Sequence, residues 1–263
     1  MFRGKLRLGK LIFKRYLDHA TPISFNAHHN IIYTIPNTKE NLGVELLING
    51  VYENDIVDFL KLQIPDGAIF FDIGANIGSI GLPVVKHKQN IRYVGFEASP
   101  VVFKYLQDNF SVNKIKFFDL ENKLVLKDDG HLMNFYQSEL YGKSSLSPTY
   151  SNEFVQVESL SLDRYCIAHN ISCIDWMKVD VQGFEIFVFE GMQNLLQDKK
   201  VKNILFEFEP WAEKEAGVQI GIAKDYIMSM GYDLLTLKGE CWSGHKTDRD
   251  TMLWAKPKQH YDF

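Results

Sequence analysis

The chain has 263 residues, of which 46% are hydrophobic and 24% charged, and its formal net charge is −4. This length and apolar fraction predict one large core with a smaller appendage, and the lack of a basic surplus argues against a nucleic-acid-binding protein. Three cysteines without C-x-x-C spacing, and no recognisable export signal, indicate free thiols in a reducing, cytoplasmic setting and argue against a structural zinc site. No apolar run approaches the ~18 residues that a membrane-spanning helix needs.

The first twenty residues predict a basic amphipathic helix, because apolar residues alternate loosely with lysine and arginine. Such a helix either packs on the protein with its basic side solvated or lies on an anionic membrane surface. The first arrangement is the commoner one. A peripheral membrane contact through this helix therefore stays open.

Residues 22–37 carry β-branched and aromatic residues between turn formers, which predicts a strand and a turn. In residues 53–64 the apolar residues recur at helical spacing, until a Pro-Asp-Gly sequence ends the segment. We take that sequence as the boundary between an N-terminal helix-and-strand cap, residues 1–65, and a main domain, residues 66–263.

Strand-like and helix-like segments alternate through the main domain. Short apolar runs predict strands at residues 68–74, 91–99, 115–120, 174–181 and 203–209, with two more near the end at 232–237 and 251–256. Helices are expected between them, one of them over residues 184–197 and another opened by Ser99 as N-cap and Pro100 as first residue. This alternation predicts a doubly wound, mostly parallel α/β sheet of the Rossmann-like kind with an antiparallel edge, which binds ligands at the carboxyl ends of its strands.

The sequence DIGANIG, residues 72–78, ends the first of these strands. Gly74 would allow a sharp turn with positive φ, and Gly78 would let a ligand approach the next helix. The spacing differs from the G-x-G-x-x-G pattern of dinucleotide-binding proteins, because Asn76 replaces the second glycine, and from the Gly-Lys-Ser/Thr ending of a P-loop. Asp72, in front of the turn, would repel a pyrophosphate but favour an ammonium group.

A second acid, Glu97, follows the second strand about twenty residues after the glycines. A carboxylate there can accept hydrogen bonds from the 2′ and 3′ hydroxyls of a ribose. The two acids and the glycine turn together point to a nucleoside that carries an amino acid, and S-adenosylmethionine fits that description. The residues expected to bind it are Asp72, Gly74, Ala75, Asn76, Gly78, Glu97 and Ser99.

Four separated blocks of the chain resemble the FkbM-type methyltransferases, a branch of the S-adenosylmethionine-dependent Rossmann-like enzymes. The blocks span residues 50–78, 93–100, 159–192 and 204–210, in the family's order. The third block contains the most characteristic run, Lys-x-Asp-x-x-Gly-x-Glu. The family usually has glutamate where this chain has Gln182, and glutamine keeps the hydrogen-bonding reach but loses the charge.

The resemblance implies methyl transfer, in which positioning and proton removal from the acceptor are what the protein adds. Asp180, at the end of the fourth strand, would accept or orient the proton of an acceptor hydroxyl, or else cap the next helix. Glu185, in the first turn of that helix, matches the family pattern and is also favoured by the helix dipole. Lys178 would serve catalysis or form an ion pair with Asp180 or Glu207. We place no catalytic role on Gln182.

We therefore expect an O-methyltransferase, and the resemblance implies a hydroxyl of a sugar, a glycan precursor or a natural product as acceptor. Two alternatives stay open. One is a protein of the same fold that binds the cofactor without turnover, suggested by Gln182. The other is a metal-assisted sugar methyltransferase, suggested by Glu207 and Glu209, although no third ligand identifies itself and no metal is expected. A nicotinamide-dependent oxidoreductase would need the glycine fingerprint that this chain lacks.

Overall fold

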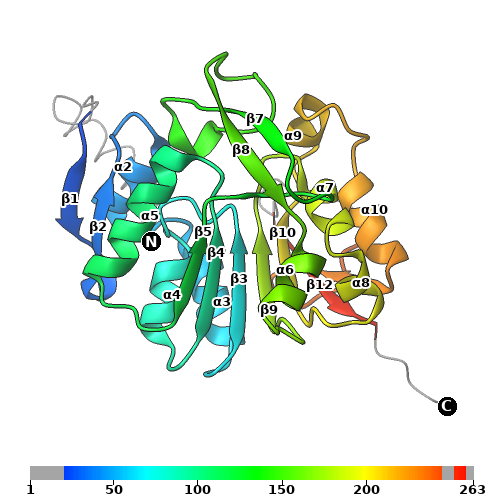
Figure 1. Ribbon diagram of the computed structural model, residues 1–263. Helices are drawn as coiled ribbons and strands as arrows, with labels where there is room; N and C mark the ends of the chain where they lie inside the picture. Colours follow the sequence, from blue (N-terminus) through cyan, green and yellow to red (C-terminus); the bar gives the residue numbers. More distant parts are fainter. Residues whose placement is uncertain (1–20, 245–251, 259–263) are drawn as a thin grey trace.

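The computed structural model describes residues 21–244 and 252–258. A seven-stranded sheet forms its centre, with the strand order β11-β12-β10-β9-β3-β4-β5 (Figure 1). The strands are β3 (Ile69–Ile73), β4 (Arg92–Phe96), β5 (Phe118–Glu121), β9 (Trp176–Val179), β10 (Ile204–Glu207), β11 (Tyr232–Leu235) and β12 (Met252–Pro257).

All neighbouring strands of this sheet run parallel except at β12, which pairs antiparallel with both β10 and β11. The predicted parallel α/β sheet with an antiparallel strand at one side is confirmed. The order reverses between β3 and β9, because the chain adds β4 and β5 on one side of β3 and returns to build the other side. Ligand sites of such sheets lie at this reversal.

Two hydrophobic layers cover the sheet, and successive residues of each strand alternate between them. Phe70 of β3 faces the first layer with α3 (Asn54–Gln63), α4 (Gly81–His87) and α5 (Pro100–Val112). Phe71 faces the second layer with α6 (Leu162–Ala168), α7 (Glu185–Glu190), α8 (Gln193–Gln197) and α10 (Ile222–Ser229). Short α9 (Pro210–Glu215) follows β10.

Local signals placed several helix ends correctly. The Ser99 hydroxyl accepts a hydrogen bond from the backbone N–H of Val102 at 3.3 Å, and Pro100 is the first residue of α5. Pro83 is the third residue of α4, within the first turn where proline is tolerated. The helix expected over residues 184–197 is instead two short helices, α7 and α8, that break near Gly191. A Cβ at Gly191 would lie 2.1 Å from the carbonyl oxygen of Leu126.

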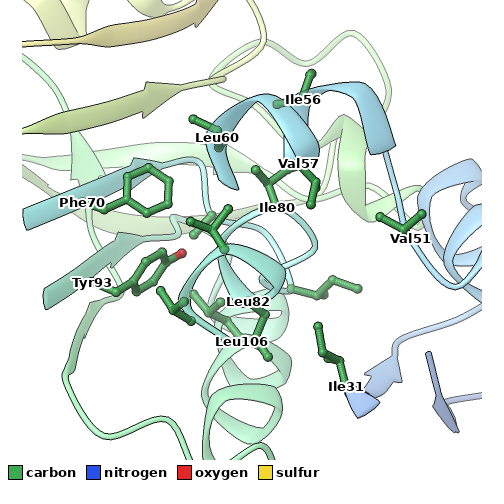
Figure 2. Close-up of a cluster of buried hydrophobic side chains, with 14 of the residues drawn as sticks. Ile31, Val51, Ile56, Val57, Leu60, Phe70, Ile80, Leu82, Tyr93 and Leu106 are labelled. Carbon is green, nitrogen blue, oxygen red and sulfur yellow. The ribbon is translucent and has the colours of Figure 1, made fainter. Parts of the chain in front are cut away.

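In the described part of the cap, residues 22–37, where a strand and a turn were expected, form two strands, β1 (Ile23–Asn26) and β2 (Ile32–Ile35), and the expected helix α3 is present. The 3₁₀ helix η1 (His28–Asn30) joins the strands, and α2 (Asn41–Asn49) was not predicted. Cap residues pack in the first hydrophobic layer against the main sheet, as Figure 2 shows for Leu60 and Phe70. The division at residue 65 stays a prediction, and the basic N-terminal helix lies outside the described residues.

A second sheet of three strands, in the order β6-β8-β7, was also not predicted. It consists of β6 (Leu124–Val125), β7 (Leu132–Tyr136) and β8 (Phe154–Leu160). Figure 1 shows β7 and β8 beyond the carboxyl ends of the central strands. The polar segment between β7 and β8 holds the 3₁₀ helix η2 (Tyr141–Lys143). Among the helices of residues 21–244, none is long and apolar enough to cross a membrane.

Candidate functional site

A cavity of about 190 Å³ opens at the carboxyl ends of β3, β4 and β9, where the strand order reverses. Its floor is the turn from Gly74 to Asn76. Its walls come from the ends of β4 and β9, from the cap, and from the η2 segment. Of the residues expected to bind the cofactor or to act in catalysis, six line this cavity: Gly74, Ala75, Asn76, Glu97, Lys178 and Asp180.

The two glycines of the turn make room for the protein itself. Gly74 has a φ of 76°, and a Cβ there would lie 2.0 Å from the carbonyl oxygen of Asp180. Gly78 has a φ of 83°, and a Cβ there would meet the side chains of Phe110 and Leu82. Gly78 therefore faces the core between α4 and α5 and lies outside the cavity lining.

Asp72 is fully buried and lies beneath the turn, outside the cavity lining. Its Oδ2 accepts a hydrogen bond from the Tyr93 hydroxyl at 2.8 Å, and its Oδ1 lies 3.2 Å from Nζ of Lys178. The ammonium group that this acid attracts is thus supplied by the neighbouring strand, because Asp72 and Lys178 are partners in the β3–β9 register.

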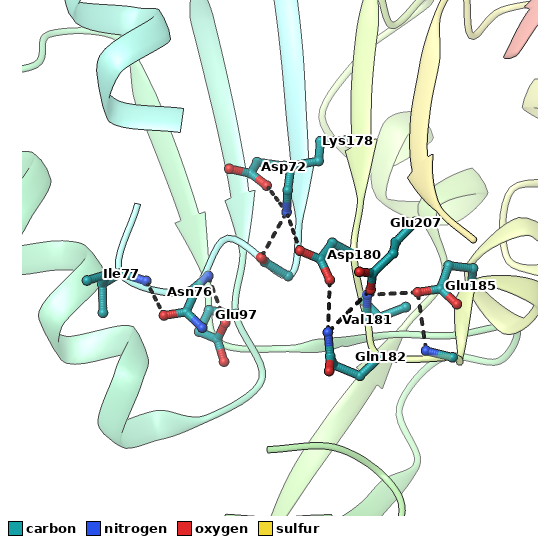
Figure 3. A network of polar contacts seen from close by, with 12 residues as sticks. Asp72, Asn76, Ile77, Glu97, Lys178, Asp180, Val181, Gln182, Glu185 and Glu207 are labelled. Carbon is teal, nitrogen blue, oxygen red and sulfur yellow. Dashed lines mark hydrogen bonds and ion pairs between the residues drawn. The ribbon is translucent and has the colours of Figure 1, made fainter. Parts of the chain in front are cut away.

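Lys178 joins the turn to the end of β9 (Figure 3). Its Nζ donates to the carbonyl oxygen of Gly74 at 3.3 Å and lies 3.5 Å from Oδ2 of Asp180. Burial acts to lower the pKa of Lys178, but the charges of Asp72 and Asp180 outweigh it and raise that pKa above its ordinary value. Lys178 is therefore a permanently charged support for the turn and for Asp180.

Glu97 follows β4 and is only 8% exposed. Its Oε2 accepts a hydrogen bond from the backbone N–H of Asn76 at 2.9 Å, and its Oε1 accepts one from the N–H of Ser99 at 2.8 Å. Burial raises the pKa of Glu97 to about 7, against the lowering effect of these two donors. Each oxygen keeps a further lone pair for a ligand hydroxyl. Ser99 itself caps α5 and does not line this cavity.

Three carboxylates, Glu53, Asp180 and Glu207, line the cavity beyond the turn, and we call them the acid cluster. Burial and the charge of Asp180 raise the pKa of Glu53 to about 7. Burial, followed by the charges of Asp180 and Glu185, raises the pKa of Glu207 well above its ordinary value. Each of these buried acids thus disfavours the ionisation of its neighbours.

Gln182 bridges two members of the acid cluster (Figure 3). Its Nε2 donates to Oδ1 of Asp180 at 3.2 Å and to Oε2 of Glu207 at 3.4 Å. A glutamate at this position could not donate these hydrogen bonds at neutral pH. The amide of Gln182 therefore lets the two acids lie close together without adding a charge.

Glu185 lies behind the cavity wall, not in the lining. It is 2% exposed, and its Oε1 accepts hydrogen bonds from the backbone N–H groups of Val181 at 3.0 Å and of Gly183 at 3.3 Å. Burial raises its pKa to about 7. These contacts fix the backbone on either side of Gln182.

Several lining residues carried no recognisable signal in the sequence. Leu124, Val125 and Leu126 on and after β6, together with Phe135 of β7, make one wall apolar. Glu40, the N-cap of α2, and Tyr141 of η2 also line the cavity. The small sheet was not predicted, so the apolar residues that it places at the cavity could not be found either.

A family model described as a methyltransferase FkbM domain matches residues 72–234, more than half of the chain. A comparison with curated protein sequences found no match. Among solved structures, precorrin-6y C5,15-methyltransferase from Geobacter metallireducens is similar at 14% identity, over 78% of this chain and 87% of that chain, with a TM-score of 0.45. A TehB-like S-adenosylmethionine-dependent methyltransferase from Corynebacterium glutamicum is similar at 13% identity, over 82% and 93%, also with a TM-score of 0.45. With TM-scores below 0.5 and identities below 25%, these two similarities add no information on function or fold beyond the strand order.

Proposed function

The chain belongs to the FkbM methyltransferase family and is an S-adenosylmethionine-dependent methyltransferase, and from this premise we propose that it methylates a hydroxyl oxygen of a sugar, a glycan precursor or a natural product. The observation that supports an oxygen acceptor is the acid cluster at the end of the cavity. Hydroxyl groups lose a proton when they are methylated, and carboxylates are suitable proton acceptors.

The residues that would hold the cofactor fit its chemistry. Glu97 has an acceptor lone pair on each oxygen for the two ribose hydroxyls. The apolar wall formed by Leu124, Val125 and Phe135 offers a dry surface for the purine ring. When bound, the sulfonium supplies an already activated methyl group, so the protein needs to position the acceptor and take its proton.

Within this proposal, Asp180 and Glu53 are the groups that contact the acceptor hydroxyl. Both line the cavity. Because the pKa of Glu53 is raised to about 7, its carboxylate can both take up and release a proton near neutral pH. Glu53 is held in the left-handed region at φ 45° as the N-cap of α3, a strained conformation that is common at functional sites. Lys178 and Glu185 would act as positioning residues, through Asp180 and through the backbone beside Gln182.

Two measurements test the proposal in sequence. Calorimetric titration with S-adenosylmethionine and S-adenosylhomocysteine, with NAD as control, should show binding of the first two only. A panel of sugars and hydroxylated natural products is then incubated with the cofactor carrying a radioactive methyl group, and the product's methyl position is determined by NMR.

For Asp180→Asn we expect a loss of about a hundredfold or more in the rate of label transfer, with binding of S-adenosylhomocysteine retained within a few fold. A methyl group found on nitrogen or carbon would refute the oxygen acceptor. Binding without transfer to any acceptor would favour the alternative without turnover, and loss of transfer on adding a chelator would favour the metal-assisted alternative.

A further inference from the structure

Two buried polar groups in the cavity lining are not fully hydrogen-bonded within the described part of the chain. They are Oε2 of Glu40 and the hydroxyl oxygen of Tyr141, and the two residues are 7% and 5% exposed. A buried polar group that lacks a hydrogen-bond partner destabilises the protein, and a charged one does so more strongly. Because both groups lie on the wall of one cavity, a ligand in that cavity could supply the missing hydrogen-bond partners.

The orientation of the Glu40 carboxylate is set by the protein. Glu40 is the N-cap of α2, and its Oε1 accepts a hydrogen bond from the backbone N–H of Asn41 at 2.8 Å. The second oxygen is left for another donor. Gly142 lies beside this carboxylate, and a Cβ there would be in van der Waals contact with the carboxyl carbon at 3.4 Å.

Tyr141 belongs to η2, and its hydroxyl lies against α2. A Cβ on Gly43 of α2 would lie 2.7 Å from that oxygen, so only glycine at this position leaves room for the hydroxyl. The two segments are also joined outside the cavity. Lys39 pairs with Glu139 at 2.7 Å, and Nδ2 of Asn37 donates to the carbonyl oxygen of Glu139 at 3.0 Å.

The charge of Glu40 indicates what kind of ligand group would complete its hydrogen bonding. Among the described residues, no lysine, arginine or histidine forms an ion pair with Glu40. Lys39 pairs with Glu139, and the ammonium of Lys143, which lines the same cavity, lies 5.2 Å from the ring centroid of Trp211. A buried carboxylate is stabilised best by a cation. Burial, followed by the charge of Glu40, raises the pKa of Tyr141, against the lowering effect of the backbone N–H of Gly43. The hydroxyl therefore stays neutral, and its own proton is left to donate to a ligand.

We propose that Glu40 and Tyr141 bind the amino-acid end of S-adenosylmethionine, with Glu40 accepting from the ammonium group and Tyr141 donating to the carboxylate. An acceptor-only group beside a donor matches an α-amino acid, whose two charges are one carbon atom apart. The inference rests on the proposed function and deepens it, because it assigns the cofactor's tail to the cap and η2. Glu97 and the apolar wall then remain for the ribose and the base.

The test compares two ligands that differ by this tail. S-adenosylhomocysteine has the amino acid, and 5′-methylthioadenosine has the same nucleoside without it. Calorimetric titration of the full chain should show that Glu40→Gln weakens binding of S-adenosylhomocysteine by about tenfold or more and leaves 5′-methylthioadenosine within about twofold. The matched control is Glu240→Gln, the same substitution on an exposed carboxylate that does not line the cavity, and we expect no change with either ligand.

Two results would overturn the inference while leaving the proposed function intact. One is unchanged binding of S-adenosylhomocysteine by Glu40→Gln, and the other is an equal loss with both ligands, which would mean that the substitution alters the shape of the cavity. If the unaltered protein binds neither ligand, the proposed function and this inference fail together. Should Glu40→Gln not fold, Tyr141→Phe decides the question, since it removes one oxygen and should weaken only S-adenosylhomocysteine.

Discussion

Replacing Gly74 by alanine should damage both the fold and the cavity. An added Cβ would lie 2.0 Å from the carbonyl oxygen of Asp180, far inside van der Waals contact. Neither backbone can easily move. The N–H of Gly74 donates to the carbonyl of Phe96 at 3.0 Å, and the N–H of Asp180 donates to the carbonyl of Ile73 at 3.1 Å.

A control variant separates this contact from the effect of backbone conformation. Gly67 has a φ of 77°, nearly the same as the 76° of Gly74, but a Cβ there would meet no atom within 4 Å. Alanine in this region costs about 1–2 kcal/mol, partly offset by the reduced entropy of the unfolded chain. Gly67→Ala should therefore lower the free energy of unfolding by about 1 kcal/mol. Gly74→Ala adds an overpacking cost of about 1–3 kcal/mol, for a total of about 3 kcal/mol.

The free energies are measured by urea unfolding, followed by two probes so that two-state behaviour is checked. Calorimetric titration with S-adenosylhomocysteine gives a second readout, in which Gly74→Ala should lose binding while Gly67→Ala keeps it. Equal destabilisation by the two substitutions, within about 0.5 kcal/mol, would refute the reasoning. It would mean that the contact with the carbonyl of Asp180 relaxes without significant cost.

Gln182→Glu should destabilise the protein by about 1–2 kcal/mol at pH 8 and less at pH 5.5, because it replaces the amide that donates to Asp180 and Glu207 by another carboxylate. Thermal unfolding at the two pH values checks this, and equal losses at both would contradict it. Glu97 should make the ligand-free protein less stable as the pH rises. Its pKa is about 7 in the fold and 4.5 ordinarily, so the folded state keeps a proton that the unfolded state releases. This retained proton contributes about 3 kcal/mol to the free energy of unfolding. The contribution is fully present below about pH 4.5 and is lost as the pH rises through about 7. Urea unfolding of Glu97→Gln should show a smaller decline between pH 5 and 8 than the unaltered protein, and an identical decline would refute the assignment.

The central sheet and its helices could be predicted because their signals are local. Buried parallel strands are short apolar runs, and a helix start such as Ser99-Pro100 depends on two neighbouring residues. The placement of β12 between β10 and β11 could not be predicted from local signals. An apolar strand can pair on either side, and which strands become its neighbours depends on the whole sheet.

The small β6-β8-β7 sheet shows where local signals fail. Three of the five residues of β7 are exposed, so the strand has no clear alternation of apolar and polar residues. Its pairing with β8, across a connection of residues 137–153, stabilises it instead. The apolar wall and the Tyr141 hydroxyl, which this sheet and its connection place at the cavity, were therefore missed.

By itself, the sequence determined the fold class, the strand ends at which the site lies, and the family of the protein, because each depends on short blocks of neighbouring residues. Only the tertiary structure decided what each polar group faces. Asp72 turned out to face Lys178, and Gly74 the carbonyl of Asp180. Such contacts join residues more than a hundred positions apart, and the register of β3 and β9 that creates them comes from packing of the whole sheet.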